Sequence, residues 1–370
     1  MAQGWVVYEL TDSPLMLGLV NFAALLPVVP ISLLAGVLSD RFSRRKLIIA
    51  TESVLALQAL IMAALIWSGM IQVWHIIVLS FILGAAAALE QPARLAFVMD
   101  VVGKEDLSNA VALNSSAYNA ARIIGPSIAG LIIAAFGEAA CFAINGVTYL
   151  AVILPLLFIH IPIKATTEDK VPIMGGMVDG LKYTWNSKVI RDLMFIVALA
   201  SFLTLPYIAL MPVFAKDILQ VGAQGLGFLL TAVGFGAILG AFGVATLEEG
   251  HRGLWLAIAN VVGPILLILF CLSNSFYLSL LLVVLVGASN ATRQTLANSL
   301  IQLNAADEYH GRVMSIFNLL FNGMSRAGAL GIGAMAEFAS AAWAMGSSAI
   351  ISAIIGLILL IRLPAIRKLP

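Results

Sequence analysis

The sequence GVLSDRFSRRK, residues 36–46, lies between two long apolar runs. Its glycine permits a close approach of two backbones where the first run ends, and its aspartate can accept hydrogen bonds. Arg41, Arg44, Arg45 and Lys46 place four cations within six residues, and such clusters favour the cytoplasmic side of a membrane. We therefore interpret the segment as a short basic loop between two membrane-spanning helices.

The composition indicates the same environment for the whole chain. Of 370 residues, 61% are hydrophobic and only 11% are charged, and the mean hydropathy is +1.04. Apolar runs of about eighteen residues or more recur, which is the length of a membrane helix. These values exclude a water-soluble globular protein. Cys141 and Cys271 lie inside apolar runs far apart, so we expect buried free thiols and no disulfide framework.

The apolar runs predict eleven complete membrane helices and a fragment of one more. Residues 2–10 are apolar but too short to cross about 30 Å of hydrocarbon. This short fragment after Met1 suggests that most of a first helix is missing, and no signal-peptide pattern is present. The complete spans are expected at residues 14–38, 46–68, 73–101, 107–136, 140–161, 190–215, 223–247, 253–272, 276–304, 309–338 and 341–362.

The cations predict the orientation of these helices. Nearly all Lys and Arg residues in loops fall on one side, and the loops of the other side hold only Lys216. By the positive-inside rule the basic side is cytoplasmic. The C-terminus and the polar segment 162–188 are then cytoplasmic, in a multi-pass protein of the plasma membrane.

An internal repeat divides the chain into two halves. Sliding the sequence by 203 residues aligns Gly84 and Gln91 with Gly287 and Gln294, and further glycines at the same helix depth. Two halves related by an axis along the membrane normal are expected to show this register. We therefore predict an all-α membrane protein built of an N-terminal half at 1–161, a linker at 162–188 and a C-terminal half at 189–370.

The basic loop also carries a family resemblance. Residues 36–46 resemble the G-x-L-x-D-R-x-x-R-R-K loop between the second and third helices of major facilitator superfamily transporters. Segments 107–114, 119–130, 206–214 and 311–315 are similar to the branch of this superfamily that contains enterobactin-exporter-like and drug-efflux permeases. Because separate segments match in the correct order, the resemblance covers essentially the whole chain.

The resemblance implies a secondary transporter rather than an enzyme. It implies a proton-coupled exporter of small amphipathic molecules, drug-like or siderophore-like, which works by alternating access as a monomer without a metal or another cofactor. Its partners would be the substrate, the proton gradient and the lipid bilayer, and not nucleic acid. The substrate cavity between the halves is expected to be lined by Asn21, Glu90, Gln91, Asn114, Arg122, Tyr207, Gln294 and Asn322.

Two arginines lie deep inside apolar runs. Arg122 is expected near the middle of its helix, and Arg326 lies at a similar depth in a later one. A charge there costs about 2.5 kcal/mol or more, so each side chain should face a wet cavity or a partner. They could recognise an anionic substrate group, interact with a protonatable carboxylate, or form a fixed ion pair between helices.

Glu90 is the best-placed candidate for proton coupling, ahead of Glu52 and of Glu9 and Glu337 near helix ends. Arg94 follows Glu90 by four residues, a spacing that puts both on one helix face and allows a local ion pair. The alternative is a latch, in which Glu90 approaches Arg293 across the cavity and closes the inner gate.

The remaining candidates concern conformational change. In the basic loop, Asp40 could take part in a charge network with Arg44 that stabilises one conformation. Gly36, Arg41 and Arg45 of the same loop are further candidates for gating. The Gly125-Pro126 pair and Gly130 permit a kink and close helix contact, and resemble an element that antiporters carry in the same helix. Ordinary helix packing is the alternative. Prolines such as Pro206 would similarly suit bending helices.

A non-transporting membrane protein remains the alternative function. A truncated chain without its first helix could be inactive or could serve as a scaffold. The sequence contains no Gly-rich loop followed by Lys-Ser or Lys-Thr, so it carries no recognisable ATP-hydrolysis motif. Its four histidines are isolated, without metal-ligand spacing.

Overall fold

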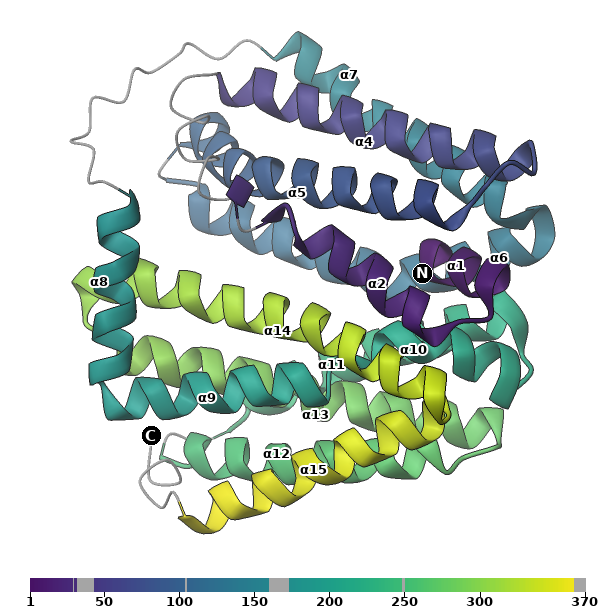
Figure 1. The fold of residues 1–370 in the computed structure, drawn as a ribbon. Helices are drawn as coiled ribbons and strands as arrows, with labels where there is room; N and C mark the ends of the chain where they lie inside the picture. The colour runs from purple at the N-terminus through teal and green to yellow at the C-terminus, as the bar shows by residue number, and fades with distance from the viewer. Residues whose placement is uncertain (29, 32–42, 104, 160–172, 248–249, 363–370) are drawn as a thin grey trace. The chain divides into compact units, whose positions relative to one another are not determined.

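The computed structural model describes residues 1–28, 30, 31, 43–103, 105–159, 173–247 and 250–362, and every regular element in these ranges is a helix (Figure 1). Eight of the described helical segments are long and apolar enough to cross a membrane. The helices form two compact units. Unit 1 contains residues 1–12 and 19–170, and unit 2 contains residues 13–18 and 171–370.

The helices of unit 1 pack around α4. Helix α4 contacts α5, α6 and α7, and α1 lies against α5 and α6. The described helices are α1 (Ala2–Thr11), most of α2 (Pro14–Leu25), α4 (Arg44–Trp67), α5 (Val73–Val102), α6 (Leu107–Thr148) and α7 (Leu150–Phe158).

The helices of unit 2 form one connected set, because α12 packs on both α13 and α15. Helix α13 packs on α11 and α12, and α14 packs on α9 and α15. The described elements are α8 (Ile173–Asn186), α9 (Lys188–Leu203), α10 (Tyr207–Val213), η1 (Phe214–Ile218), α11 (Gly222–Ala245), α12 (Arg252–Cys271), α13 (Phe276–Asn304), η2 (Asp307–Tyr309), α14 (His310–Phe338) and α15 (Ala341–Arg362).

Residues with positive φ end several of these helices. Helix α1 ends at Asp12 (φ 47°), and Gly69 (φ 67°) follows α4. Gly103 (φ 73°) ends α5, while Gly137 (φ 81°) breaks the long α6 inside. Glycine reaches this region without a steric penalty, which explains why the polypeptide turns at these points. The break at Gly137 agrees with the expected gap between residues 136 and 140.

In two segments the structure differs from the expected uninterrupted spans and unstructured linker. The span expected at residues 190–215 is interrupted between Leu203 and Tyr207, so it comprises α9 and α10, in agreement with the bend expected at Pro206. The polar linker contains the helix α8, which the sequence did not predict. Its Tyr183 stacks on Tyr309 with ring centroids 4.3 Å apart and accepts a hydrogen bond from the Ala306 amide. Packing on the start of α14 therefore stabilises α8.

Two glycines aligned by the internal repeat make equivalent contacts. A Cβ atom at Gly84 on α5 would overlap the carbonyl oxygen of Ala24 on α2, and a Cβ atom at Gly287 on α13 would overlap that of Val233 on α11. Only glycine allows backbones to approach this closely. The same helix-to-helix contact thus recurs in both units, which supports the repeat independently of sequence identity.

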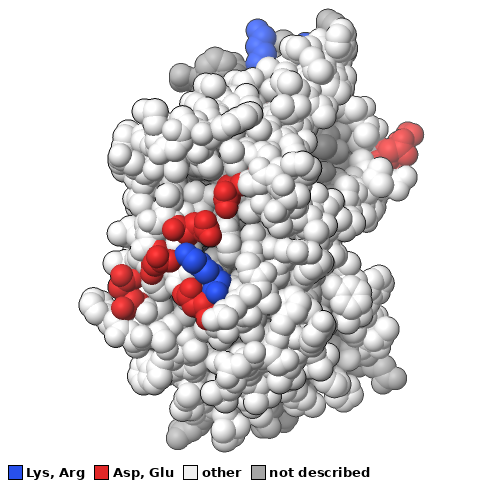
Figure 2. All heavy atoms as spheres, turned by 90° about the vertical axis from the view of Figure 1, so that its right-hand side faces the viewer, with Lys and Arg blue, Asp and Glu red and all other residues white. Residues whose placement is uncertain are grey.

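The exterior of the helices suits lipid. Helix α15 exposes a stripe of large apolar side chains at Ile350, Ile354, Ile358 and Ile361, each at least 48% exposed. Its opposite face buries small residues such as Ala349. A regular apolar stripe of this kind is expected for a helix that faces hydrocarbon. Figure 2 shows the helix ends on the right-hand side of Figure 1, where most of the surface is uncharged and the charged side chains are mainly acidic.

Candidate functional site

Unit 1 contains a cluster of three charged side chains, hereafter the Arg94 cluster. Arg94 on α5 donates a hydrogen bond from Nη2 to Glu52 Oε1 of α4 at 2.6 Å. The same nitrogen forms an ion pair with Glu90, one helical turn earlier. The Glu52 side chain is 1% exposed, that of Glu90 12% and that of Arg94 47%. One guanidinium is therefore shared by two carboxylates with little access to water.

Helix periodicity explains how the cluster forms. Glu90 and Arg94 are four residues apart and share a face of α5. Glu52 lies on the buried face of α4, which also buries Leu55 and Ala59, and that face packs against α5. The structure thus shows the local Glu90–Arg94 pair that the spacing allowed. It adds Glu52, which the sequence analysis treated only as a separate candidate.

A second group of ionic contacts holds the ends of α4, α5 and α7. Arg44 forms an ion pair with Asp100 through two hydrogen bonds, at 2.7 and 2.8 Å. Arg45 donates hydrogen bonds to the carbonyls of Leu156 and Leu157, which are among the last of α7. A cation at a helix C-terminus satisfies carbonyls that lack a partner within the helix. Both arginines therefore join helices within unit 1.

The charge network predicted for the basic loop is only partly described. Gly36, Asp40 and Arg41 lie outside the described residues. For Arg44, the ion-pair partner in the structure is Asp100, which the sequence analysis had not named. A role of these residues in stabilising one conformation stays a prediction.

We expect the Arg44→Ala variant to lose little stability. Both side chains of the Arg44–Asp100 pair are about one third exposed (31% and 34%), and an ion pair of this kind contributes about 0.5–1 kcal/mol. Thermal unfolding of the purified protein measures the change, and Asp100→Asn should lower the midpoint by a similar amount. A double variant much less stable than either single variant would contradict this account.

Unit 2 contains a buried arginine with a neutral partner. Arg293 is 5% exposed and donates a hydrogen bond from Nη2 to Asn290 Oδ1 at 2.7 Å. Tyr207 lies close enough to interact with it electrostatically. Among the described residues no carboxylate forms an ion pair with Arg293, so its charge is balanced only by polar groups. The latch between Glu90 and Arg293 stays a prediction, because each has its described partner within its own unit.

The other residues predicted to line the cavity are distributed over both units. In unit 1, Gln91, Asn114 and Arg122 are exposed, and Asn21 is partly buried. In unit 2, Gln294 is partly buried, while Asn322 is exposed and donates to the carbonyl of Asn318 on its own helix. A cavity formed by both sets stays a prediction.

The role predicted for Gly125, Pro126 and Gly130 in helix contact and bending stays a prediction. Within the described part of the chain, a Cβ atom at Gly125 would meet no atom within 4 Å. Helix α6 also continues through Pro126 without a non-helical residue, and its break lies at Gly137 instead. Gly130 is buried. Exposure thus differs along the motif, because Gly125 is exposed, Pro126 is partly buried and Gly130 is buried.

Two further candidate residues, Arg326 and Glu337, lie on α14. Arg326 is partly buried on α14. Glu337, near the end of the same helix, accepts hydrogen bonds from Ser13 Oγ at 2.7 Å and from the Leu15 amide at 3.2 Å. Amides of a first helical turn lack partners within the helix, so this carboxylate satisfies the start of α2. A role of Glu337 in proton coupling stays a prediction.

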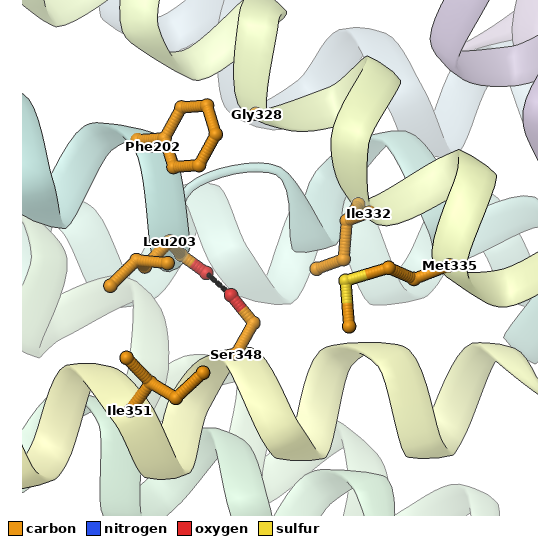
Figure 3. Close-up of a pocket in the computed structure, with 7 residues that line it drawn as sticks. All are labelled: Phe202, Leu203, Gly328, Ile332, Met335, Ser348 and Ile351. Carbon is orange, nitrogen blue, oxygen red and sulfur yellow. Dashed lines mark hydrogen bonds between the residues drawn. The ribbon is translucent and has the colours of Figure 1, made fainter.

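A small apolar pocket lies in unit 2 between α9, α14 and α15 (Figure 3). Phe202, Ile332, Met335 and Ile351 provide most of its lining. The hydroxyl of Ser348 donates a hydrogen bond to the Leu203 carbonyl at 2.7 Å, drawn as a dashed line in Figure 3. The pocket therefore lacks a free polar group that could orient a charged or polar ligand.

Metal chemistry finds no support in the described residues. Within these ranges, no group of three or more His, Cys, Asp or Glu side chains could hold a metal ion. Cys141 and Cys271 are free, as expected, although Cys141 is only partly buried. The Arg94 cluster is accordingly the candidate site with the most distinctive chemistry.

Repeated units of long apolar helices with a buried ionic cluster define a membrane transporter of the major facilitator type. Comparison with known proteins agrees, because the family model described as transmembrane secretion effector (MFS_3) matches residues 1–369. The chain belongs to this family. It is a multi-pass membrane protein.

Curated relatives are transporters of two kinds. The staphyloferrin A transporter of Staphylococcus aureus is 25% identical, over 88% of this chain and 82% of the relative. The multidrug efflux pump Tap of Mycolicibacterium fortuitum is 25% identical, over 90% of this chain and 84% of the relative. The enterobactin exporter EntS of Shigella boydii is 25% identical, over 91% of this chain and 82% of the relative. These names agree with the branch that the sequence resembles.

Solved structures support the fold. The nucleoside transporter NupG superposes with a TM-score of 0.71 at 13% identity, over 99% of this chain and 94% of that chain. The xylose transporter XylE from E. coli, in an inward-open conformation, superposes with a TM-score of 0.69 at 14% identity. The superposition covers 96% of this chain and 91% of that chain. At this identity, the likeness concerns the arrangement of helices and not the substrate.

Proposed function

We propose that this chain is a proton-coupled exporter of small amphipathic molecules, drug-like or siderophore-like, that works by alternating access. The observation that carries the proposal is its similarity to siderophore and drug exporters over more than four fifths of both chains. The Arg94 cluster supplies the ionisable groups that a proton-coupled transporter needs inside its helices. The protein acts as a monomer with no cofactor.

The proposed orientation places the C-terminus in the cytoplasm. Four arginines lie at or near the starts of helices, as expected for the basic side of the membrane: Arg44, Arg45, Arg252 and Arg312. The face drawn in Figure 2 carries mainly acidic groups, which fits the opposite side. Substrate would then move away from the basic side while protons move toward it.

We expect everted membrane vesicles that contain the 370-residue chain to accumulate a fluorescent amphipathic dye when their lumen is acidic. An exporter would then face its cytoplasmic side outward and exchange lumenal protons for dye. A parallel assay would use a radiolabelled, iron-free catecholate or citrate-type siderophore. Fluorescence quenching and filtration measure the two fluxes.

The control is the same vesicles after an uncoupler has collapsed the gradient, together with vesicles that lack the protein. Loss of accumulation with the uncoupler supports proton coupling, and the preferred cargo identifies the substrate class. If neither the dye nor either siderophore crosses the membrane faster than in empty vesicles, the chain is a non-transporting protein and the proposal is wrong.

A further inference from the structure

We infer that the Arg94 cluster binds one exchangeable proton and that this proton resides on Glu52. The inference rests on the proposed function, because it names the group through which proton coupling would act. It differs from the expectation based on sequence, in which Glu90 alone was the preferred proton carrier. The cluster joins two helices, α4 and α5, of unit 1.

The first argument is charge balance. With both carboxyl groups ionised, Glu52, Glu90 and Arg94 together carry one excess negative charge. The helices packed on α4 are α5, α6 and α7, and from the α6–α7 junction Tyr149 is close enough to interact electrostatically with all three groups. A phenol is neutral near pH 7, so it does not cancel the excess. One bound proton would make the cluster neutral, which a site among membrane helices favours.

The second argument is an oxygen atom without a partner. Glu52 Oε1 accepts the hydrogen bond from Arg94, whereas Glu52 Oε2 is buried and has no hydrogen-bond partner in the structure. A buried carboxylate oxygen left in this state costs free energy. The side chains of Glu52 and Glu90 are within hydrogen-bonding reach of each other. Two carboxylates both accept hydrogen bonds, so a bond between them requires a proton on one of them.

The third argument concerns which carboxyl group holds the proton. Glu52 is 1% exposed and Glu90 12%, so Glu52 is the more completely removed from water. Loss of hydration disfavours a charge, and the group with less hydration is neutralised first. The local partner of Glu90 also lies on its own helix, one turn away, which keeps that ion pair intact. Glu52 therefore carries the proton, and Glu90 and Arg94 position it.

The cluster also has a route for exchange. The Arg94 side chain is 47% exposed, so water can reach one side of the guanidinium. Glu52 lies eight residues after Arg44, which corresponds to about 12 Å along α4. Movement of α5 relative to α4 would separate Arg94 from Glu52 and alter the affinity of Glu52 for the proton. This is the coupling that an alternating-access cycle requires.

The proton can be detected directly by infrared difference spectroscopy of the full-length protein during a pH titration. A protonated carboxyl group has a carbonyl stretch separate from that of a carboxylate. We expect the wild-type protein to show one titrating carboxyl band that is absent from Glu52→Gln. The band should persist, although shifted, in Glu90→Gln, and should be unchanged in the control Glu105→Gln, whose side chain is exposed and outside the cluster.

A transport assay tests the role of Glu52 independently of the infrared spectrum. One proton exchanged per substrate allows about tenfold accumulation for each unit of pH gradient, since a tenfold ratio corresponds to about 1.4 kcal/mol. Glu52→Gln should lose this accumulation and keep movement of substrate down its own gradient. Glu52→Asp, which retains a carboxyl group, should recover part of the accumulation and provides a second variant if Glu52→Gln folds poorly.

The outcomes separate the two proposals. If the wild-type protein shows the titrating band but no gradient-driven flux, the proposed function fails and the proton site stands. If flux is gradient-driven but the band survives in Glu52→Gln, the assignment to Glu52 is wrong. Loss of the band in Glu90→Gln alone would place the proton on Glu90 and overturn the inference as well.

Discussion

The Arg94→Met variant is expected to be less stable than the wild-type protein by about 2 kcal/mol, with a fall of several degrees in Tm. Removing one partner of a buried ion pair usually costs about 3–5 kcal/mol, because the other charge stays buried without compensation. The cost here is smaller because Arg94 is 47% exposed, whereas the Glu90 carboxylate, at 12% exposed, is left without its cation while Glu52 carries the proton. Methionine retains much of the apolar length of the side chain. Thermal unfolding of the purified, full-length protein in detergent measures the change.

A second substitution tests the cause of that loss. In the double variant Glu90→Gln/Arg94→Met the buried charge is absent, because Glu52 carries the proton, so we expect most of the lost stability to return. The control is Arg191→Met, because Arg191 is 42% exposed and its nearest carboxylate, on Asp192, is 3.8 Å away. A double variant no more stable than Arg94→Met would show that the loss arises from packing and not from the unbalanced carboxylate of Glu90.

The spans were predictable because each requires about twenty apolar residues, a signal that lies in one continuous segment. The helices α4, α5, α11, α13 and α15 begin and end within a few residues of the expected limits. Helix α8 was not predictable in this way, because its 14 residues are too few to cross the membrane and its Tyr183 stacks on Tyr309, more than a hundred residues away. Hydropathy contains no information about such a contact.

The candidate site was predictable only in part, for a similar reason. The spacing of Glu90 and Arg94 within one helix allowed their ion pair to be anticipated. The contribution of Glu52 depends on how α4 is rotated about its own axis toward α5, which hydropathy does not determine. The available signal was energetic, since a carboxylate in an apolar run requires a counter-ion, and Arg94 was the arginine nearest in depth.

Replacing Gly240 with alanine is expected to lower the stability of unit 2 by about 2 kcal/mol, within the usual range for overpacking. A Cβ atom there would overlap the carbonyl group of Ala288, where α11 meets α13. Gly243→Ala is the matched control, since it makes the same substitution on the same helix and its Cβ atom would meet no atom within 4 Å. Tm and the monodisperse fraction of purified protein measure both effects.

The obstruction at Gly240 comes from backbone atoms, and this makes the prediction specific. Ala288→Gly should not restore Gly240→Ala, because removing a methyl group leaves the obstructing carbonyl of residue 288 in place. Gly84→Ala should produce a similar loss in unit 1, because its Cβ atom would overlap the carbonyl group of Ala24 where α5 meets α2. If Gly240→Ala and Gly243→Ala lower Tm equally, the loss reflects helix flexibility rather than close packing. The repeated contact would then not be what holds these helix pairs together.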